Sequence, residues 1–183
     1  MWINSVTNLI GFFMRTLLTL LISLIFPLTC FAQSSSDGMT AGVFKLTPEV
    51  IEDVSGRLKT SLAKITDPKQ ESLAFELIGS DQGYNLFLVL RGNTGTSEIH
   101  RTVSDLHTAV EGRATLVIGG ELVGEYELSP GQMRGTSIKG GTDYAIRAGD
   151  AVNIPANVPH HVVVAPGEQY MYFVYQVDSD KLK

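Results

Sequence analysis

Hydrophobic and polar residues alternate with two different periods along this chain. The first period is helical: Thr47-Pro48-Glu49 supplies a capping hydroxyl, a proline in the first turn and an early acid, and Asp67-Pro68 ends the segment. One apolar face follows at helical spacing between these signals, made of Val50, Val54, Leu58, Leu62 and Ile65. The pattern predicts an N-terminal helix within residues 47–67, packed on the outside of the domain or on a partner subunit.

After Pro68 the pattern changes to short apolar or alternating runs, most of them separated by glycine and Asn/Asp. These runs predict strands over residues 73–78, 84–91, 105–110, 114–118, 151–154, 161–164 and 170–177. Many short strands with glycine turns are typical of a β-sandwich or a β-barrel. The sequence therefore predicts one all-β domain over residues 70–179, preceded by the helix.

The first 32 residues have a different character. A positive residue, Arg15, precedes an apolar run and a small-residue exit at Cys30-Phe31-Ala32, which together match a secretory signal peptide. Cleavage after Ala32 would remove residues 1–32 and leave residues 33–46 as a flexible linker. Two alternatives are lipid attachment at Cys30, although Pro27-Leu28-Thr29 is a poor lipoprotein box, and retention of the segment as a membrane anchor, although its apolar run is short for a span. We expect a secreted or periplasmic protein, at a membrane only if the segment is retained.

Charge and cysteine content limit the binding partners and the covalent cross-links that the protein can have. The formal net charge is −5 and becomes −6 once Arg15 is removed with the signal, and no basic patch is present. We therefore expect no nucleic-acid partner, because such binding needs clustered Lys and Arg. Cys30 is the only cysteine, so a chain cleaved after Ala32 would have to be held by its core without disulfides.

The candidate chemistry is concentrated in one region. All four histidines lie between His100 and His161. Because side chains alternate along a strand, Asp105 and His107 share a face, whereas His160 and His161 point to opposite faces. Imidazole and carboxylate together suit Zn, Mn, Fe or Ni, and two imidazoles with one carboxylate resemble the arrangement that leaves open positions on non-heme iron. The residues predict a divalent-metal site, with His161 on the outer face.

The spacing of these residues resembles the two signatures of the cupin family. The first is Gly, five residues, His-x-His, four residues, Glu, six residues, Gly, and this chain fills those slots with Gly92, Glu98, His100, Asp105 and Gly112. Glu98 stands where the family has its first His, and Asp105 where it has Glu.

The second signature is Gly, five residues, Pro, x, Gly, two residues, His. This chain has Gly149, Pro155, Asn157 and His160 in those slots. Asn157 replaces a turn glycine, and asparagine tolerates the left-handed conformation better than most residues. The resemblance, over roughly residues 84–177, implies a cupin double-stranded β-helix (jelly-roll) barrel with a divalent metal held inside it.

Carried over residue by residue, the resemblance implies that His100, Asp105, His160 and Glu98 are the metal ligands. Aspartate is one methylene shorter than glutamate, so Asp105 would reach the metal only if the backbone moved in or through a water, or it would orient a histidine instead. Glu98 or His107 would serve as a further ligand or as the catalytic general base. The alternative for His100 and His160 is that they are hydrogen-bonded barrel histidines without metal.

Two functional hypotheses follow. In the first, the protein binds a divalent metal and acts on or holds a small molecule, with oxygenase, isomerase or lyase chemistry left open because one fold supports all three. In the second, it is a non-catalytic small-molecule-binding or assembly module without metal, and the helix serves a dimer interface. Arg134 and Lys139, in the long segment between the signatures, are candidates to meet an anionic ligand. Cupin barrels often pair through sheet edges, so we expect a homodimer.

Overall fold

The computed structural model describes residues 43–183. The expectations for residues 1–32, and for the linker up to residue 42, lie outside the described residues. Within residues 43–183, none of the helical structure has the length and apolar character needed to cross a membrane.

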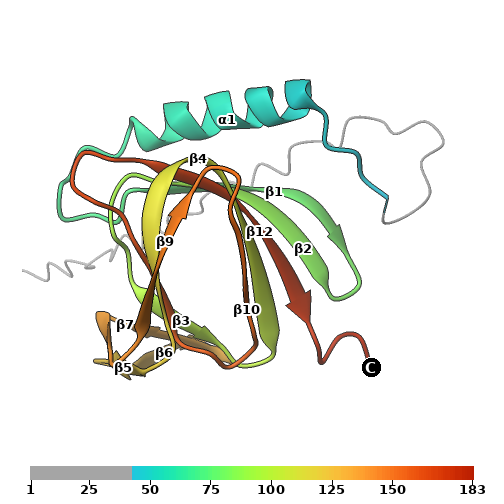
Figure 1. The fold of residues 1–183 in the computed structure, drawn as a ribbon. Helices are drawn as coiled ribbons and strands as arrows, with labels where there is room; N and C mark the ends of the chain where they lie inside the picture. Colours follow the sequence, from blue (N-terminus) through green and yellow to red (C-terminus); the bar gives the residue numbers. More distant parts are fainter. Residues whose placement is uncertain (1–42) are drawn as a thin grey trace, which may run out of the picture. The chain divides into compact units, whose positions relative to one another are not determined.

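The N-terminal helix α1 runs from Pro48 to Leu62 and begins at its predicted cap, where the Thr47 hydroxyl accepts a hydrogen bond from the backbone N–H of Val50. It ends earlier than the apolar pattern suggested. Its buried face packs against outward-facing side chains of the domain's own sheet, in one cluster made of Val54, Leu58, Leu62, Ala74, Leu88, Leu90 and Met171. Figure 1 shows α1 lying across the outside of that sheet. The helix thus covers its own domain, so its apolar face is not free to form the dimer interface of the second hypothesis.

Twelve strands follow α1 within the described residues: β1 Leu73–Asp81, β2 Tyr84–Arg91, β3 Ser97–His100, β4 Val103–Ile118, β5 Glu121–Val123, β6 Tyr126–Ser129, β7 Gln132–Gly135, β8 Ser137–Lys139, β9 Thr142–Arg147, β10 Ala151–Ile154, β11 His160–Val163 and β12 Tyr170–Asp178. All pairings among them are antiparallel. The predicted all-β class with a preceding helix is confirmed.

Strand β4 belongs to both walls of the barrel. Its first half pairs with β12 and β10, and β12 continues through β2 to the edge strand β1. Its second half pairs with β9 and β11, and β11 continues through β3 and β7 to the edge strand β6. The two walls curl toward each other (Figure 1), and the main hydrophobic core packs between them, with Leu116, Val162 and Tyr170 among its buried members. The arrangement is the jelly-roll barrel that the sequence predicted.

The change from one wall to the other occurs at Gly112. Its φ is +78°, and a Cβ added there would lie 2.0 Å from the carbonyl oxygen of Gln169. The register between β4 and β12 also shifts beside it, between Met171 and Tyr172. Only glycine accommodates both the left-handed backbone and this close approach, so this residue lets one strand bend into two sheets.

The sequence reading was wrong in two places. Residues 105–110 and 114–118 belong to one strand, because Gly112 bends the chain without ending the strand, and the pairing partner changes there from β12 to β9. The short strands β3 and β5 to β8 were not predicted. Strand β6 is exposed at every position, so it lacks the alternation on which strand prediction depends.

Candidate metal centre

The two walls of the barrel bring five predicted site residues together. Strands β3 and β11 contribute Glu98, His100 and His160 from one wall, and the first half of β4 contributes Asp105 and His107 from the other. One ligand atom each from Glu98, His100 and His160 lie within 4.8 Å of one another. The backbone register explains part of this grouping, because Glu98 lies directly opposite His160 on the neighbouring strand.

Asp105 faces the imidazoles from the opposite wall. Its Oδ2 lies 3.3 Å from Nε2 of His100, 3.6 Å from Nε2 of His160 and 3.9 Å from Nε2 of His107. Its Oδ1 accepts a hydrogen bond of 3.1 Å from the Gln176 side-chain amide. The shorter carboxylate thus approaches the histidines closely enough to share a cation with them, directly or through a water.

Two hydrogen bonds fix the orientation of the imidazoles. Nδ1 of His160 lies 3.1 Å from the backbone carbonyl oxygen of Val158, and Nδ1 of His100 contacts the side-chain oxygen of Gln132. Those oxygens only accept, so both Nδ1 atoms carry the hydrogen. Both Nε2 atoms are therefore left to face the carboxylates, which is the arrangement found for metal-bound histidine.

Glu98 is held by two arginines as well as facing the histidines. Its Oε1 pairs with Arg91 at 3.1 Å, and its Oε2 pairs with Arg134 at 3.2 Å and lies 3.5 Å from Nε2 of His100. Arg91 is only 4% exposed and also bonds Glu71 and the Tyr172 hydroxyl. The sequence analysis missed Arg91, although strand alternation places it on the same face as Val89, which lines the same cavity.

These contacts keep both acids ionised. Burial alone would raise the pKa of the Glu98 carboxyl, but the charges of Arg134 and Arg91 outweigh it and lower that pKa. Burial opposes ionisation of Asp105 too, yet the adjacent imidazoles, of which His100 is the nearest with its Nε2 at 3.3 Å, hold the pKa of Asp105 well below its usual range. The cavity thus contains two anionic carboxylates at neutral pH.

The two histidines respond differently to the same surroundings. Burial would lower the pKa of His100, but the hydrogen bond and charge of Asp105 raise it above its ordinary value. For His160 burial prevails over the attraction of Glu98 and Asp105, and its pKa is lowered. A neutral His160 presents its Nε2 lone pair to the Asp105 carboxylate, a repulsive pairing unless a cation lies between them.

The metal-free protein is expected to lose stability as the pH falls below the ordinary carboxyl range. Asp105 and Glu98 have lower pKa values folded than unfolded, so the unfolded chain takes up protons first. Their stabilisation is fully present above about pH 5 and declines as the pH falls toward the folded-state values. The protein is first dialysed against a chelator. Its unfolding by urea is then monitored by circular dichroism at several pH values between about pH 6 and pH 3. Asp105→Asn should show a shallower decline, and equal slopes would contradict the argument.

His107 and His161 occupy contrasting places. His107 lines the cavity and stacks on Tyr172 with ring centroids 4.7 Å apart, and its buried Nδ1 has no hydrogen-bond partner. Its Nε2 lies 3.9 Å from Oδ2 of Asp105, so it is the most distant of the three imidazoles from that oxygen. His161 points away from the cavity, as predicted, but it is not on a solvated face: it is buried, and its Nε2 bonds the carbonyl oxygen of Gly95 at 2.8 Å. Residues 92–96 cover that side of β11.

A cavity of about 560 Å³ joins these groups. Side chains from both walls line it, including Gln132 on β7 and Gln176 on β12. Arg134 lines it as well, whereas Lys139 does not and lies in the separate two-stranded sheet of β5 and β8. On the last strand, β12, Tyr172 lines the cavity and Tyr170 stacks on it with ring centroids 4.8 Å apart.

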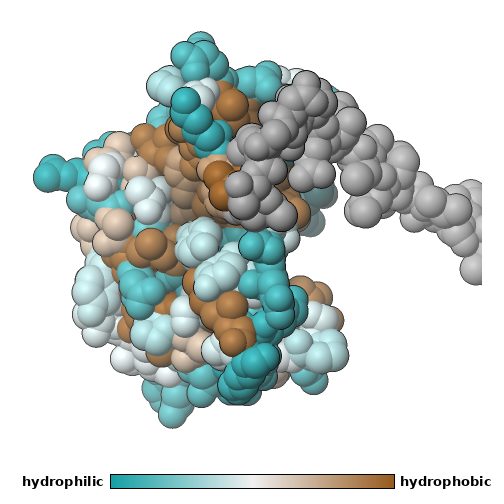
Figure 2. All heavy atoms as spheres, turned by 90° about the vertical axis from the view of Figure 1, so that its right-hand side faces the viewer, coloured by the Kyte–Doolittle hydropathy of each residue, from teal (hydrophilic) through white to brown (hydrophobic). Residues whose placement is uncertain are grey.

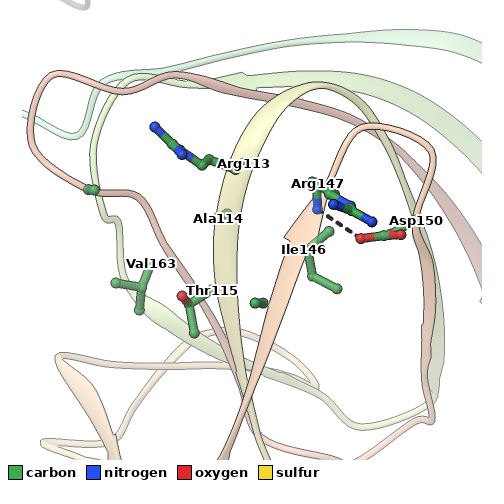
Figure 3. Close-up of a pocket in the computed structure, with 9 residues that line it drawn as sticks. Arg113, Ala114, Thr115, Ile146, Arg147, Asp150 and Val163 are labelled. Atoms are coloured by element: carbon green, nitrogen blue, oxygen red, sulfur yellow. Dashed lines mark hydrogen bonds between the residues drawn. The ribbon is translucent and has the colours of Figure 1, made fainter.

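A second hollow lies on the outer side of β4, β9 and β11, where Arg113, Thr115, Arg147 and Val163 surround it (Figure 3). Its one carboxylate, Asp150, accepts a hydrogen bond from the backbone N–H of Arg147. The hollow contains no histidine, and the group of possible metal ligands found among residues 43–183 is Glu98, His100 and His160 in the barrel interior.

The antiparallel jelly roll has both signature segments facing one interior cavity, with Gly112, Gly149 and Asn157 all at positive φ as the signature turns require. The chain has the cupin fold. Solved structures similar to this cupin barrel include a Cupin 2 conserved barrel domain protein from Salinispora arenicola (TM-score 0.43, 18% identity, 62% of this chain and 82% of that chain). Another is KdgF from Halomonas sp. (TM-score 0.42, 14% identity, 64% of this chain and 89% of that chain).

A third similar structure is the polyketide cyclase RemF from Streptomyces resistomycificus (TM-score 0.42, 17% identity, 62% of this chain and 70% of that chain). No protein-family model and no curated protein matches the chain. What this cupin barrel binds must therefore be argued from its own residues.

Proposed function

We propose that this cupin barrel binds one divalent transition-metal ion through His100, His160 and Glu98, and that the bound ion holds a small molecule. The supporting observation is the pair of imidazoles whose Nδ1 atoms are engaged by acceptor oxygens and whose Nε2 atoms face carboxylates at 3.3 to 3.6 Å. Asp105 completes the set, directly or through a water. Zn, Mn, Fe and Ni all suit these donors.

When bound, such an ion supplies a Lewis acid that polarises an oxygen of the substrate. The chain's own residues do the rest. Glu98 and Asp105 balance the charge of the ion, and the stack of His107 on Tyr172 fixes the His107 ring. The free Nδ1 of His107 is placed to hold or move a proton in oxygenase, isomerase or lyase chemistry.

One observation favours a second candidate, a non-catalytic pocket without metal. Glu98 replaces an imidazole and already has Arg91 and Arg134 as partners. If it stays with them, two histidines and one aspartate remain. The barrel would then serve as a binding module for a small molecule.

Export and assembly complete the proposal. We propose that residues 1–32 direct the chain out of the cytoplasm and are removed after Ala32, which makes the protein secreted or periplasmic. The mass of the purified protein tests this, since a chain that begins at Gln33, a chain lipidated at Cys30 and a retained anchor differ in mass. The homodimer stays a prediction, for which light scattering is the direct measurement.

The wild-type protein is expected to contain close to one equivalent of metal by inductively coupled plasma mass spectrometry. His100→Ala and His160→Ala should bind it more than about 100-fold more weakly, and Gln132→Ala, which removes only the acceptor of His100 Nδ1, about 10-fold more weakly. His161→Ala is the matched control and should retain the metal, with the fold of every variant checked by circular dichroism. No metal in wild type after loading with Mn, Fe, Ni and Zn would leave the binding module as the answer.

A further inference from the structure

One wall of the site cavity carries a run of apolar side chains. Phe75 on β1 and Phe87 on β2 lie edge to face, with ring centroids 6.1 Å apart, and both line the cavity. Val89 and Val174 continue this lining inward and are buried, and His107 follows on the neighbouring strand β4. The polar cluster therefore lies at the inner end of a continuous hydrophobic path.

The rim of that path exposes large hydrophobic side chains. Phe75 is 62% exposed on edge strand β1, and Leu128 and Tyr126 are 60% and 49% exposed on edge strand β6. All three line the same cavity, and Figure 2 shows hydrophobic side chains reaching the surface between polar ones on one side of the molecule. Exposed apolar groups bordered by polar ones mark binding surfaces.

The charges around the cavity set the sign of a complementary ligand. Its lining contains three carboxylates, Glu71, Glu98 and Asp105, and two guanidinium groups, Arg91 and Arg134. Without metal the lining has one excess negative charge, and a divalent ion reverses this to one excess positive charge. In a partly enclosed site of low effective dielectric, such an excess favours a ligand of opposite charge.

We propose that the ligand is an amphipathic organic monoanion, with an oxyanion head at the histidine–carboxylate cluster and an apolar body between β1 and β6. This inference rests on the metal of the proposed function. A small molecule fits better than a protein segment for two reasons: the apolar lining leads inward to the metal-ligating residues, and about 560 Å³ lies within the range of small-molecule sites.

The test compares three probes by calorimetry on the purified protein, either Zn-loaded or treated with chelator: 3-phenylpropanoate, its alcohol 3-phenylpropan-1-ol, and propanoate. The Zn-loaded protein should bind 3-phenylpropanoate at least about 10-fold more tightly than either of the others, since the alcohol lacks the charge and propanoate lacks the apolar body. Removing Zn should abolish the preference for the acid over the alcohol.

Phe75→Ala should weaken binding of 3-phenylpropanoate about 5-fold, the loss expected for one aromatic contact, and leave propanoate binding and Zn content unchanged. Tyr144→Ala is the matched control, because Tyr144 is a half-exposed aromatic residue on β9, outside the cavity lining, and it should change nothing. Equal affinities for the three probes in a Zn-containing protein would overturn the inference and leave the metal site intact. Failure of the wild-type protein to bind Zn would overturn both this inference and the proposed metal-binding function. A dimer that dissociates in Phe75→Ala would show instead that a second copy covers the rim.

Discussion

Replacing Gly112 with alanine is expected to prevent the chain from reaching its native fold. The residue has a φ of +78°, and the new Cβ would meet the backbone carbonyl of Gln169 at 2.0 Å. A side chain could rotate away from such a clash, but this carbonyl belongs to the backbone that leads into β12. The left-handed backbone alone costs about 1 kcal/mol, and with the clash we expect a loss above about 4 kcal/mol, much of the stability of an ordinary domain. Urea unfolding and soluble yield measure it.

Gly149→Ala is the matched control for that variant. Gly149 also has a positive φ, +93°, but no atom outside its immediate neighbours lies within 4 Å of an added Cβ. Gly149→Ala should therefore lower the free energy of unfolding by only about 1 kcal/mol, the cost of holding alanine in the left-handed backbone conformation. Equal losses in the two variants would show that the bend of β4 does not depend on the close approach at Gly112.

Arg91→Met is expected to reduce the free energy of unfolding by about 3 to 5 kcal/mol, because it removes a buried cation and leaves the largely buried Glu98 with Arg134 as its one guanidinium partner. The guanidinium is 4% exposed and bridges Glu71 and Glu98, with a further hydrogen bond to the Tyr172 hydroxyl. Methionine keeps the length of the side chain but none of these donors. The measurement is urea unfolding at pH 7 of the protein without metal.

Arg57→Met separates the effect of burial from the loss of an arginine. Arg57 also bridges two carboxylates, Asp53 and Glu76, but its side chain is 46% exposed. Exposed pairs contribute less than about 1 kcal/mol each, so this variant should unfold close to wild type. If Arg91→Met were as mild as Arg57→Met, water would have to reach the buried cluster in the folded protein.

The fold class and the central residues of the site could be predicted because their signals are local. Helical spacing marked α1, glycine-separated alternation marked the barrel, and motif spacing selected His100, Asp105 and His160. The Glu98 substitution was visible as well, but its arginine partners were not. Their role depends on strand register, which places Arg134 opposite Glu98 across β3 and β7.

The remaining site residues depend on contacts between segments far apart in the chain. Gln132 bonds His100 only because β7 pairs with β3, and Gln176 bonds Asp105 only because β12 pairs with β4. No local pattern near either glutamine indicates such a partner. His161 is a further example. Strand alternation predicted that its side chain points away from the cavity, but it could not predict the loop that buries that side chain.

The barrel's two walls are joined by different kinds of interaction at different depths. Beside the Gly112 bend they share a dry apolar core, whereas across the cavity they meet through charged pairs, Arg91 with Glu98 and Asp105 with His100. Apolar burial is insensitive to pH, but those pairs weaken once the acids are protonated. Hydrogen exchange at a pH below the ordinary carboxyl range should therefore proceed from the mouth inward, with the amides of β3 and β7 released before those of β12. We expect the cavity end of the barrel to open as a unit of its own under these conditions while the rest remains folded.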